Sequence, residues 1–396
     1  MLKNNQNEFL HMENKDFRNV LNCATKFSES VLRPMAGEFD KKECIPKEII
    51  REIASRGYLG APIPVEFGGL GMDFVNYGHL TEIIGKGCSS TRAILTVHTS
   101  LVSQTILKLG TKIQKDTYLK SLSKGELLGC FALSEPAAGS DANAVQTTYE
   151  IDEDYYVING KKKWITLGAI ADLFLVIASR DKIVSAFIVD AKSLGVIIKP
   201  MTGLLGSRGA YIAEIEFMNV KVPCANMLAR EGGGFSFVAN TALLYGRYSV
   251  AWGALAVAQA ALEEMASYSR VRAQYGEKIG QFQLIKAMIA DAVTNIYAAR
   301  ALCIKIGEML DFENDAAVMG VNIAKQFSAR TAMKVTTDAV QLFGGNGCWD
   351  QYPVERLFRE AKILEIIEGT DQIQQILIGK YGIKKYGKRK FDYISN

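Results

Sequence analysis

Residues 243–276 read LLYGRYSVAWGALAVAQAALEEMASYSRVRAQYG, the first of three long helical patterns near the C-terminus. Their apolar residues recur at spacings of three and four over a wide face, which predicts a helix that is buried on most sides. The same spacing returns in IKAMIADAVTNIYAARALCIKIGEML (285–310) and AKQFSARTAMKVTTDAVQLFG (324–344). Three such helices predict a C-terminal bundle.

A short helix is predicted to follow these three. It begins after Thr370, whose hydroxyl can cap the first turn by accepting a backbone hydrogen bond. We expect the apolar residues Ile373, Ile376 and Leu377 to face inward.

Helical spacing also dominates the first part of the chain. Ile49, Ile50 and Ile53 illustrate it. The segment GAPIPVEFGGLGMD (60–73) interrupts the pattern and is too rich in Gly and Pro to be anything but a loop. The sequence therefore predicts an N-terminal helical domain.

In the middle of the chain the apolar residues recur with a different spacing. DLFLVIAS (172–179) and SAFIVD (185–190) are short apolar runs typical of buried strands. In YYVINGKKKWI (155–165), Asn159-Gly160 lies between apolar runs and predicts a tight hairpin. We therefore predict three domains in the order helices, β domain and helices, with boundaries at 1–128, 129–238 and 239–396.

The bulk composition argues against several classes of protein. The 396 residues are 48% hydrophobic and can bury a large core, and a net charge of +4 without a basic stripe does not suggest nucleic-acid binding. The seven cysteines form no CxxC pair, which argues against a zinc site or a disulfide framework. Because no signal peptide or membrane-spanning apolar run is recognisable, we expect a cytoplasmic protein without a membrane span.

Common catalytic motifs are absent. The sequence has no GxGxxG after a strand, no GxxxxGK[ST], no HExxH and no GxSxG. With only three histidines, a histidine-based metal site is not expected, and we predict no metal. We expect His98, within LTVHTSLV (95–102), to be structural or to contact a substrate.

Four polar, glycine-rich segments interrupt apolar surroundings. In such segments the backbone can approach a flat or phosphorylated ligand closely, but an ordinary turn or core position explains each one as well. The segments are CFALSEPAAGSDA (130–142), KKKWITLGA (161–169), RAQYGEKIGQFQLIK (272–286) and QLFGGNGCWDQYPVERLFREAKI (341–363).

A further stretch, LEIIEGTDQIQQ (364–375), places Glu368 among apolar residues and directly before Gly369. An acid there is either a solvated residue at a helix end or a base with a raised pKa, held beside the group that it deprotonates. The residue pattern alone leaves both interpretations open.

Taken in order, these motifs resemble the acyl-CoA dehydrogenase flavoprotein family from about Phe17 to Tyr381. The resemblance implies an α+β fold that is mainly α, with an N-terminal helical domain, a central β-barrel-like domain and a C-terminal four-helix bundle. It also implies one noncovalent FAD per subunit and an oligomer, usually a tetramer built as a dimer of dimers. The matching segments are ALSEPAAGSDA, GKKKWIT, GSRGA, FMNVKVP, IGQFQLIKAMIAD, QLFGGNGC, YPVERLFREAKI and EIIEGTDQIQQ.

The resemblance also assigns binding residues. Positions at or beside the flavin ring are matched by Phe131, Leu133, Ser134, Gly139, Ser140, Trp164 and Thr166. Positions that hold the pyrophosphate and adenosine of a neighbouring subunit's FAD are matched by Arg272, Gln281, Phe282, Gln341 and Gly345, and dinucleotide contacts beside the base by Thr370 and Gln372. Substrate positions are matched by Ser140, Tyr245, Arg247 and Gly369.

Glu368 matches the catalytic base of the family. Removing the proton α to a thioester carbonyl needs a desolvated carboxylate with a raised pKa and hydrogen bonds to the developing enolate oxygen. The resemblance implies that a hydride passes from the β carbon to flavin N5, which gives a 2,3-enoyl thioester. Some members carry the base immediately before the arginine of the YGRYSVA segment, but here that position is Gly246, which supports Glu368.

The identity of the substrate carrier stays open. Many short-chain relatives have Leu-Asp-x-Gly-Arg where this chain has Leu244 in place of the acid, which puts the pantetheine contacts in doubt. LTVHTSLV and YGRYSVAWG also resemble a subgroup that oxidises small polar acyl groups on acyl carrier proteins in polyketide and nonribosomal-peptide pathways. The expected substrate is thus an acyl-CoA or an acyl carrier protein-bound thioester, with electron-transfer flavoprotein as a candidate partner.

Two other classes compete with this interpretation. A flavin monooxygenase or oxidase of the same fold would react with O₂ directly, but a monooxygenase needs no α-proton base, so Glu368 counts against it. A non-enzymatic helical scaffold would have no use for Trp164, Thr166 and Arg272.

Overall fold

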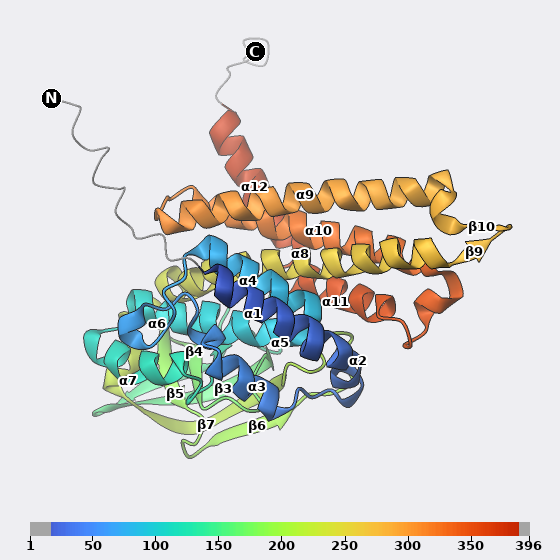
Figure 1. Cartoon of the computed structure of the whole chain (residues 1–396). Coiled ribbons are helices and arrows are strands. Elements are labelled where there is room, and N and C mark those ends of the chain that lie inside the picture. Colours follow the sequence, from blue (N-terminus) through green and yellow to red (C-terminus); the bar gives the residue numbers. More distant parts are fainter. Residues whose placement is uncertain (1–16, 388–396) are drawn as a thin grey trace, which may run out of the picture.

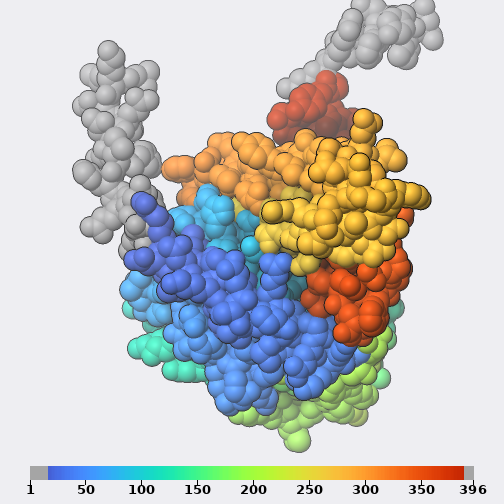
Figure 2. All heavy atoms as spheres, turned by 45° about the vertical axis from the view of Figure 1, so that its right-hand side comes forward, coloured from blue at the N-terminus to red at the C-terminus, as the bar shows by residue number. Residues whose placement is uncertain are grey.

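The computed structural model describes residues 17–387 of the chain. The elements follow the predicted order, and the structure is mostly helical with a central sheet (Figure 1). In this view the sheet lies at the bottom, the N-terminal helices lie above it, and the long C-terminal helices lie at the top. Figure 2 shows the same order of segments after a turn of the molecule.

The N-terminal region is a set of short helices. A π-helical stretch, Thr96–Ser103, continues directly from α5, and all of its residues are buried. Such stretches are uncommon in helices, and those that occur often lie at functional sites. The α-helices are α1 (Arg18–Phe27), α2 (Arg33–Lys42), α3 (Lys47–Ser55), α4 (Phe74–Gly87), α5 (Ser89–Leu95), α6 (Gln104–Leu109) and α7 (Lys112–Ser123).

The central sheet is open and not a closed barrel. Its strands pair in the order β6-β7-β3-β2-β4-β5-β8, with β1 added beside β4, and within the described residues no pairing joins the end strands β6 and β8. The expected β domain is therefore present as an open central sheet, and the barrel-like part of the expectation is wrong. The strands are β1 (Gly129–Ala132), β2 (Thr148–Asp152), β3 (Tyr155–Ile165), β4 (Leu173–Arg180), β5 (Ile183–Asp190), β6 (Val196–Pro200), β7 (Ala213–Pro223) and β8 (Met227–Leu228).

The predicted hairpin at Asn159-Gly160 is wrong. These residues lie inside the single strand β3, which pairs with β2 on one side and with β7 on the other. Asn159 instead marks an irregularity, where its side-chain Oδ1 accepts from Asn219 N–H at 2.7 Å. Gly160 is required because a Cβ there would lie 2.6 Å from the Cα of Thr147. The glycine marks a close approach of two strands and not a turn.

The C-terminal region contains the three predicted long helices and two shorter ones. Thr370 caps α12 as expected, because its hydroxyl accepts from Ile373 N–H at 3.3 Å. The prediction that Ile376 faces inward is wrong, since its side chain is exposed on α12. The helices are α8 (Asn240–Val271), α9 (Gln283–Asp311), α10 (Ala317–Phe343), α11 (Val354–Ile366) and α12 (Asp371–Tyr386).

Helix α9 has an unusually exposed apolar surface. It packs against α8 and α10, yet Leu284, Val293 and Tyr297 are exposed on its outer side. Among the residues that the structure describes, it is also the single helix with the length and apolar character of a membrane span. A core helix passes the same test, so this property alone does not indicate a membrane.

His98 joins the N-terminal helices to the sheet. It is fully buried, and its Nε2 lies 2.9 Å from the carbonyl oxygen of Leu122 while Gly129 N–H donates to Nδ1 at 3.1 Å. The Nδ1 acceptor fixes the proton on Nε2. Burial lowers the pKa of His98 to about 4. Of the two roles expected for it, the structure supports the structural one.

We predict that His98→Leu lowers the midpoint of thermal unfolding by several degrees. The change leaves the Gly129 N–H and the Leu122 carbonyl without partners, and each buried unpaired group costs about 1–3 kcal/mol. Scanning calorimetry of the purified protein measures this shift.

The same substitution should change the pH dependence of stability. The pKa of His98 in the folded protein, about 4, lies below its ordinary value of 6.5. The unfolded chain therefore binds more protons between these values, and stability is lost as the pH falls from 6.5 toward 4. The midpoint of the wild type should decrease more steeply over this window than that of His98→Leu. Equal slopes would contradict the assignment.

Candidate active site

Glu368 lies in the turn between α11 and α12. Its backbone is left-handed, with φ 58°, and Gly369 follows with φ 95°. A positive φ is costly for a residue with a side chain and is concentrated at functional sites. The turn reverses the chain and places the Glu368 carboxylate against α8, where its Oε2 atom is buried and has no hydrogen-bond partner among the described residues.

The backbone of this turn is held from two neighbouring helices. Arg247 of α8 donates from Nε to the Glu368 carbonyl at 2.8 Å, and its guanidinium also donates to Asn322. Lys325 of α10 is fully buried and donates to the Gly369 carbonyl at 2.8 Å. Gln374 adds a contact of 3.3 Å to the Glu368 carbonyl. These bonds go to the main chain, so the carboxylate itself stays free.

Gly246 provides the space for that carboxylate. A Cβ at this position would lie 2.7 Å from Oε2 of Glu368 and 2.4 Å from Leu101. The position where some members of the resembled family carry their base therefore faces the same point as Glu368. A carboxylate at residue 246 and one at residue 368 would compete for one volume, and this chain carries a carboxylate at residue 368 alone.

Burial dominates the electrostatics of Glu368. It raises the pKa of this carboxyl to about 7, although the positive charges of Arg247, Lys325 and Arg92 act in the opposite direction. Burial lowers the pKa of Lys325 to about 8. A carboxyl group with a pKa near neutrality suits proton abstraction, because it is a stronger base than an ordinary carboxylate.

A second group of predicted residues lies where β1 and β3 end. Lys163 N–H donates to the Ser134 carbonyl at 2.9 Å, which sets the loop that carries Leu133 and Ser134 beside the segment that carries Trp164 and Thr166. Trp164 is 55% exposed, so its indole presents a flat apolar surface to solvent. Gly139 and Ser140 are exposed further along the same loop, whereas Phe131 is buried within β1.

A buried ion pair supports this loop from behind. Lys162 Nζ donates to Glu135 at 2.6 Å and to the Leu133 carbonyl at 3.1 Å, and both charged side chains are almost fully buried. Glu135 also accepts from the backbone N–H groups of Gln146 and Thr147. The loop is therefore fixed by charge-assisted bonds on several sides.

The residues predicted to bind the pyrophosphate and adenosine gather at the other end of α8. Arg272 lies just beyond that helix end, with Gln281 and Phe282 after the β9–β10 ribbon (Ala273–Gln274 and Glu277–Lys278). Gln341 and Gly345 are brought to the same end because Asn346 donates to the Tyr268 hydroxyl at 2.9 Å. From Arg247 to Val271 the helix rises about 36 Å. One chain therefore presents two separate groups of residues.

Comparisons with known proteins agree with this arrangement. The family models for the N-terminal, middle and C-terminal domains of acyl-CoA dehydrogenases match residues 14–126, 130–220 and 232–382. The short-chain specific acyl-CoA dehydrogenase of Clostridium acetobutylicum is 40% identical over 368 residues, which is 91% of this chain and 96% of that relative. The chain belongs to the acyl-CoA dehydrogenase family.

Solved structures of the family share the fold. Butyryl-CoA dehydrogenase from Megasphaera elsdenii is 37% identical, with a TM-score of 0.89, and the match covers 92% of this chain and 97% of that chain. The prolyl acyl carrier protein oxidase AnaB is 26% identical, with a TM-score of 0.88, over 93% of this chain and 99% of that chain. Acyl-CoA dehydrogenases are FAD-dependent oxidoreductases that act on CH–CH bonds.

The residues present fit FAD. Exposed Trp164 beside the hydroxyls of Ser134 and Thr166 offers a surface for a flat, polar-edged ring. At the other end of α8, Gly344 and Gly345 leave open space, since no atom lies within 4 Å of a Cβ built on either. Thr370 and Gln372 at the start of α12 lie next to Glu368 in the chain, and Gln372 is exposed.

Several residues that support the candidate site were not predicted from the sequence. The sequence gives no signal for four of them, which look like ordinary polar residues within helical or strand patterns: Lys325, Gln374, Lys162 and Glu135. Arg92 was also missed, although a single arginine inside the apolar run SSTRAIL gave a signal. Lys325 and Lys162 contact groups that are far away in sequence, and Gln374 reaches back across a turn, neither of which periodicity reveals.

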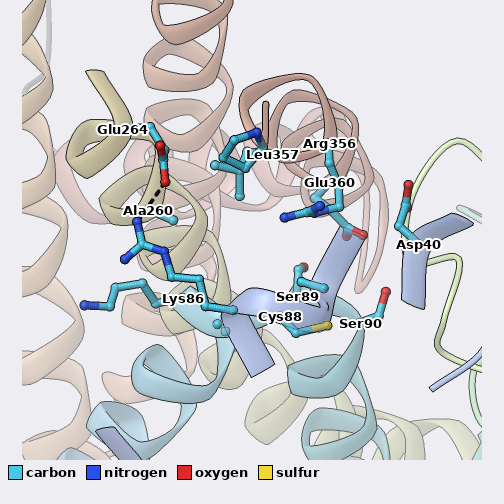
Figure 3. Close-up of a pocket in the computed structure, with 15 residues that line it drawn as sticks. Asp40, Lys86, Cys88, Ser89, Ser90, Ala260, Glu264, Arg356, Leu357 and Glu360 are labelled. Carbon is cyan, nitrogen blue, oxygen red and sulfur yellow. Dashed lines mark hydrogen bonds and ion pairs between the residues drawn. The ribbon is translucent and has the colours of Figure 1, made fainter. Parts of the chain in front are cut away.

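A separate pocket lies between α2, α4, α5, α8 and α11 (Figure 3). Its lining includes Arg33 and Glu264, which form an ion pair at 2.7 Å, and Glu360. None of the residues predicted to bind FAD or substrate is among its lining residues. It is therefore distinct from the site around Glu368.

We predict that Gly246→Ala destabilises the protein by about 1–3 kcal/mol, because the added methyl group overlaps Leu101 and the Glu368 carboxylate. Gly379→Ala is the matched control. Gly379 lies in α12 with no atom within 4 Å of the added Cβ, so alanine should stabilise that helix slightly. Thermal unfolding of both variants tests this prediction, and a neutral Gly246→Ala would contradict the described packing.

Proposed function

We propose that this protein is an α,β-dehydrogenase of an acyl thioester in which Glu368 removes the α proton. The observation that carries the proposal is the buried, unpartnered Oε2 atom of Glu368 in a turn whose backbone is fixed by Arg247 and Lys325. A base with no competing hydrogen bond can accept a proton directly from the substrate carbon.

The protein groups around Glu368 support this role. The turn holds the carboxylate in one place, and burial keeps its basicity high. FAD, when bound, supplies the acceptor for the hydride that leaves the β carbon. Trp164 and Thr166 would flank its ring system, while Leu133 and Ser134 would line its edge. Ser140 and Tyr245 would lie along the entry of the thioester, with Arg247 and Gly369 at the base.

We also propose that the active form is an oligomer. The two groups of predicted FAD residues are separated by most of the length of α8, so one chain does not bring both to one cofactor. Arg272, Gln281, Phe282, Gln341 and Gly345 would then bind the FAD of a neighbouring subunit, in a dimer of dimers. The exposed apolar side chains of α9 support this assembly, because another chain would cover them.

The substrate carrier has two candidates. The 40% identical relative is named as a short-chain acyl-CoA dehydrogenase, which favours a short acyl-CoA. Electron-transfer flavoprotein is the proposed electron acceptor. Similarity to AnaB, described as a prolyl acyl carrier protein oxidase, favours a carrier-bound substrate. The absence of the acidic residue at Leu244 agrees with a carrier that lacks the adenosine end of CoA, and we keep this as the second candidate.

Glu368→Gln is predicted to retain FAD but to lower the rate of flavin reduction by acyl thioester by several orders of magnitude. In the wild type this rate should rise with pH through about 7, because only the ionised carboxylate accepts the proton. Anaerobic stopped-flow absorbance measures both. Near-normal reduction in Glu368→Gln would remove this residue as the base.

Anaerobic flavin bleaching separates the two carriers. We expect short acyl-CoAs to bleach the flavin, and the comparison uses the same acyl groups loaded on an acyl carrier protein. Bleaching by carrier-bound groups alone would move the protein to the biosynthetic function. Bleaching by neither, together with rapid reaction of the reduced flavin with O₂, would favour a monooxygenase.

A further inference from the structure

Helix α10 holds the segment between α11 and α12 with a strip of polar side chains. Lys325 donates to the Gly369 carbonyl at 2.8 Å. Gln326 Nε2 donates to the Asp371 carbonyl at 3.3 Å. Arg330 follows Gln326 by four residues, lies on the same side of the helix, and donates to the Asp371 carboxylate at 2.8 Å. The proposed function uses Lys325 but leaves Asp371 without a role.

Asp371 is a buried acid in the first turn of α12. Arg330 Nε donates to its Oδ2 atom at 2.8 Å, and Nη2 lies 2.8 Å from the same oxygen. The other oxygen, Oδ1, is buried and has no hydrogen-bond partner among residues 17–387. A charge that is removed from water acts on its neighbours more strongly than a solvated one. The ion pair therefore leaves one carboxylate oxygen free to act on nearby groups.

Lys325 lies within reach of that charge. Its side chain is fully buried, and burial lowers its pKa to about 8. The negative charge of Asp371 is the largest influence that raises this pKa. Glu368 and Glu365 act in the same direction, whereas Arg247 acts against them. Without the charge of Asp371 the pKa of Lys325 would be lower still, so the lysine would lose its proton closer to neutral pH.

The charge of Lys325 acts on Glu368 in turn. Burial raises the pKa of Glu368 to about 7. Three positive charges oppose this rise, those of Arg247, Lys325 and Arg92. The two arginines stay protonated at any pH that the protein meets, but a lysine with a pKa of about 8 does not. A change in the charge of Asp371 therefore reaches Glu368 through Lys325.

We propose that Asp371 is a positioning residue for Glu368 that acts through Lys325, because its charge keeps this lysine positive near neutral pH. A positive Lys325 makes a charge-assisted bond to the Gly369 carbonyl, which holds the turn, and it favours the ionised form of Glu368. The proposal rests on the proposed function, because it concerns the removal of the α proton by Glu368.

The test measures anaerobic flavin reduction by butyryl-CoA in the FAD-loaded protein, from a pH below the pKa of Glu368 to one above that of Lys325. We expect Asp371→Asn to move the pH midpoint of the rate upward by about one pH unit. The reason is that Lys325 then loses its proton, and its charge no longer lowers the pKa of Glu368. Asp371→Ser removes the same charge and should give the same shift, so one variant is sufficient if the other does not fold.

The two partners of the ion pair separate an effect of charge from an effect of structure. Arg330→Met breaks the same pair but keeps the charge of Asp371, so it should not raise the midpoint. A purely structural pair would give the same result from either side. Asp338→Asn is the matched control, because Asp338 pairs with Lys334 on α10 and its side chain is 14% exposed, compared with 11% for Asp371. It should leave the midpoint unchanged.

A Lys325→Met background tests the route of the effect. Asp371→Asn should cause no further shift there, because its effect passes through the lysine. An unchanged or lowered midpoint in Asp371→Asn, an equal rise in Arg330→Met, or a full further shift in the Lys325→Met background would overturn the proposal.

Infrared spectroscopy distinguishes this proposal from the proposed function. The carboxyl band that is absent from the Glu368→Gln holoenzyme reports the ionisation of Glu368 without turnover. Its pH midpoint should rise in Asp371→Asn as the midpoint of flavin reduction does. If no thioester bleaches the wild-type flavin, the dehydrogenase function fails, and the infrared midpoint still decides the role of Asp371.

Discussion

The hydrogen bonds from Arg247 and Lys325 to the carbonyls of Glu368 and Gly369 are the constraint on which the site depends. The positive φ of Glu368 is costly for a residue with a side chain, and these two cations supply charge-assisted bonds that hold the turn. Because both cations bind main-chain oxygens, they fix the position of Glu368 without neutralising its carboxylate through a direct contact. The same hydrogen bonds therefore fix the position of the Glu368 carboxylate and leave it basic.

The long helices α8 and α10 make this arrangement possible. Arg247 and Lys325 come from different helices, and each helix is held by the packing of its apolar face in the C-terminal core. Leu101 of the π-helical stretch after α5 lies against Gly246, beside the Glu368 carboxylate. The site is therefore a place where three segments far apart in sequence converge on one turn.

The sequence predicted the parts of this fold that depend on local pattern. Apolar spacing revealed the long helices, and Thr370 marked the start of α12. The hairpin at Asn159 failed because pairing on both sides of β3 outweighed a local turn preference. Glu368 was identified through resemblance. Its close approach to Gly246, and the burial of Arg92 with two nitrogen atoms lacking hydrogen-bond partners among the described residues, depend on tertiary packing, which residue spacing does not predict.

The glycines of α8 have a consequence for local unfolding. Gly246 and Gly253 each weaken the intrinsic helix preference by up to about 1 kcal/mol relative to alanine. Yet most of the helix between them is fully buried, including Trp252. The middle of α8 is therefore held by tertiary contacts and not by its own propensity, so its amides can open only when the surrounding core opens. Slow, cooperative hydrogen exchange across this segment is the behaviour that such a helix shows.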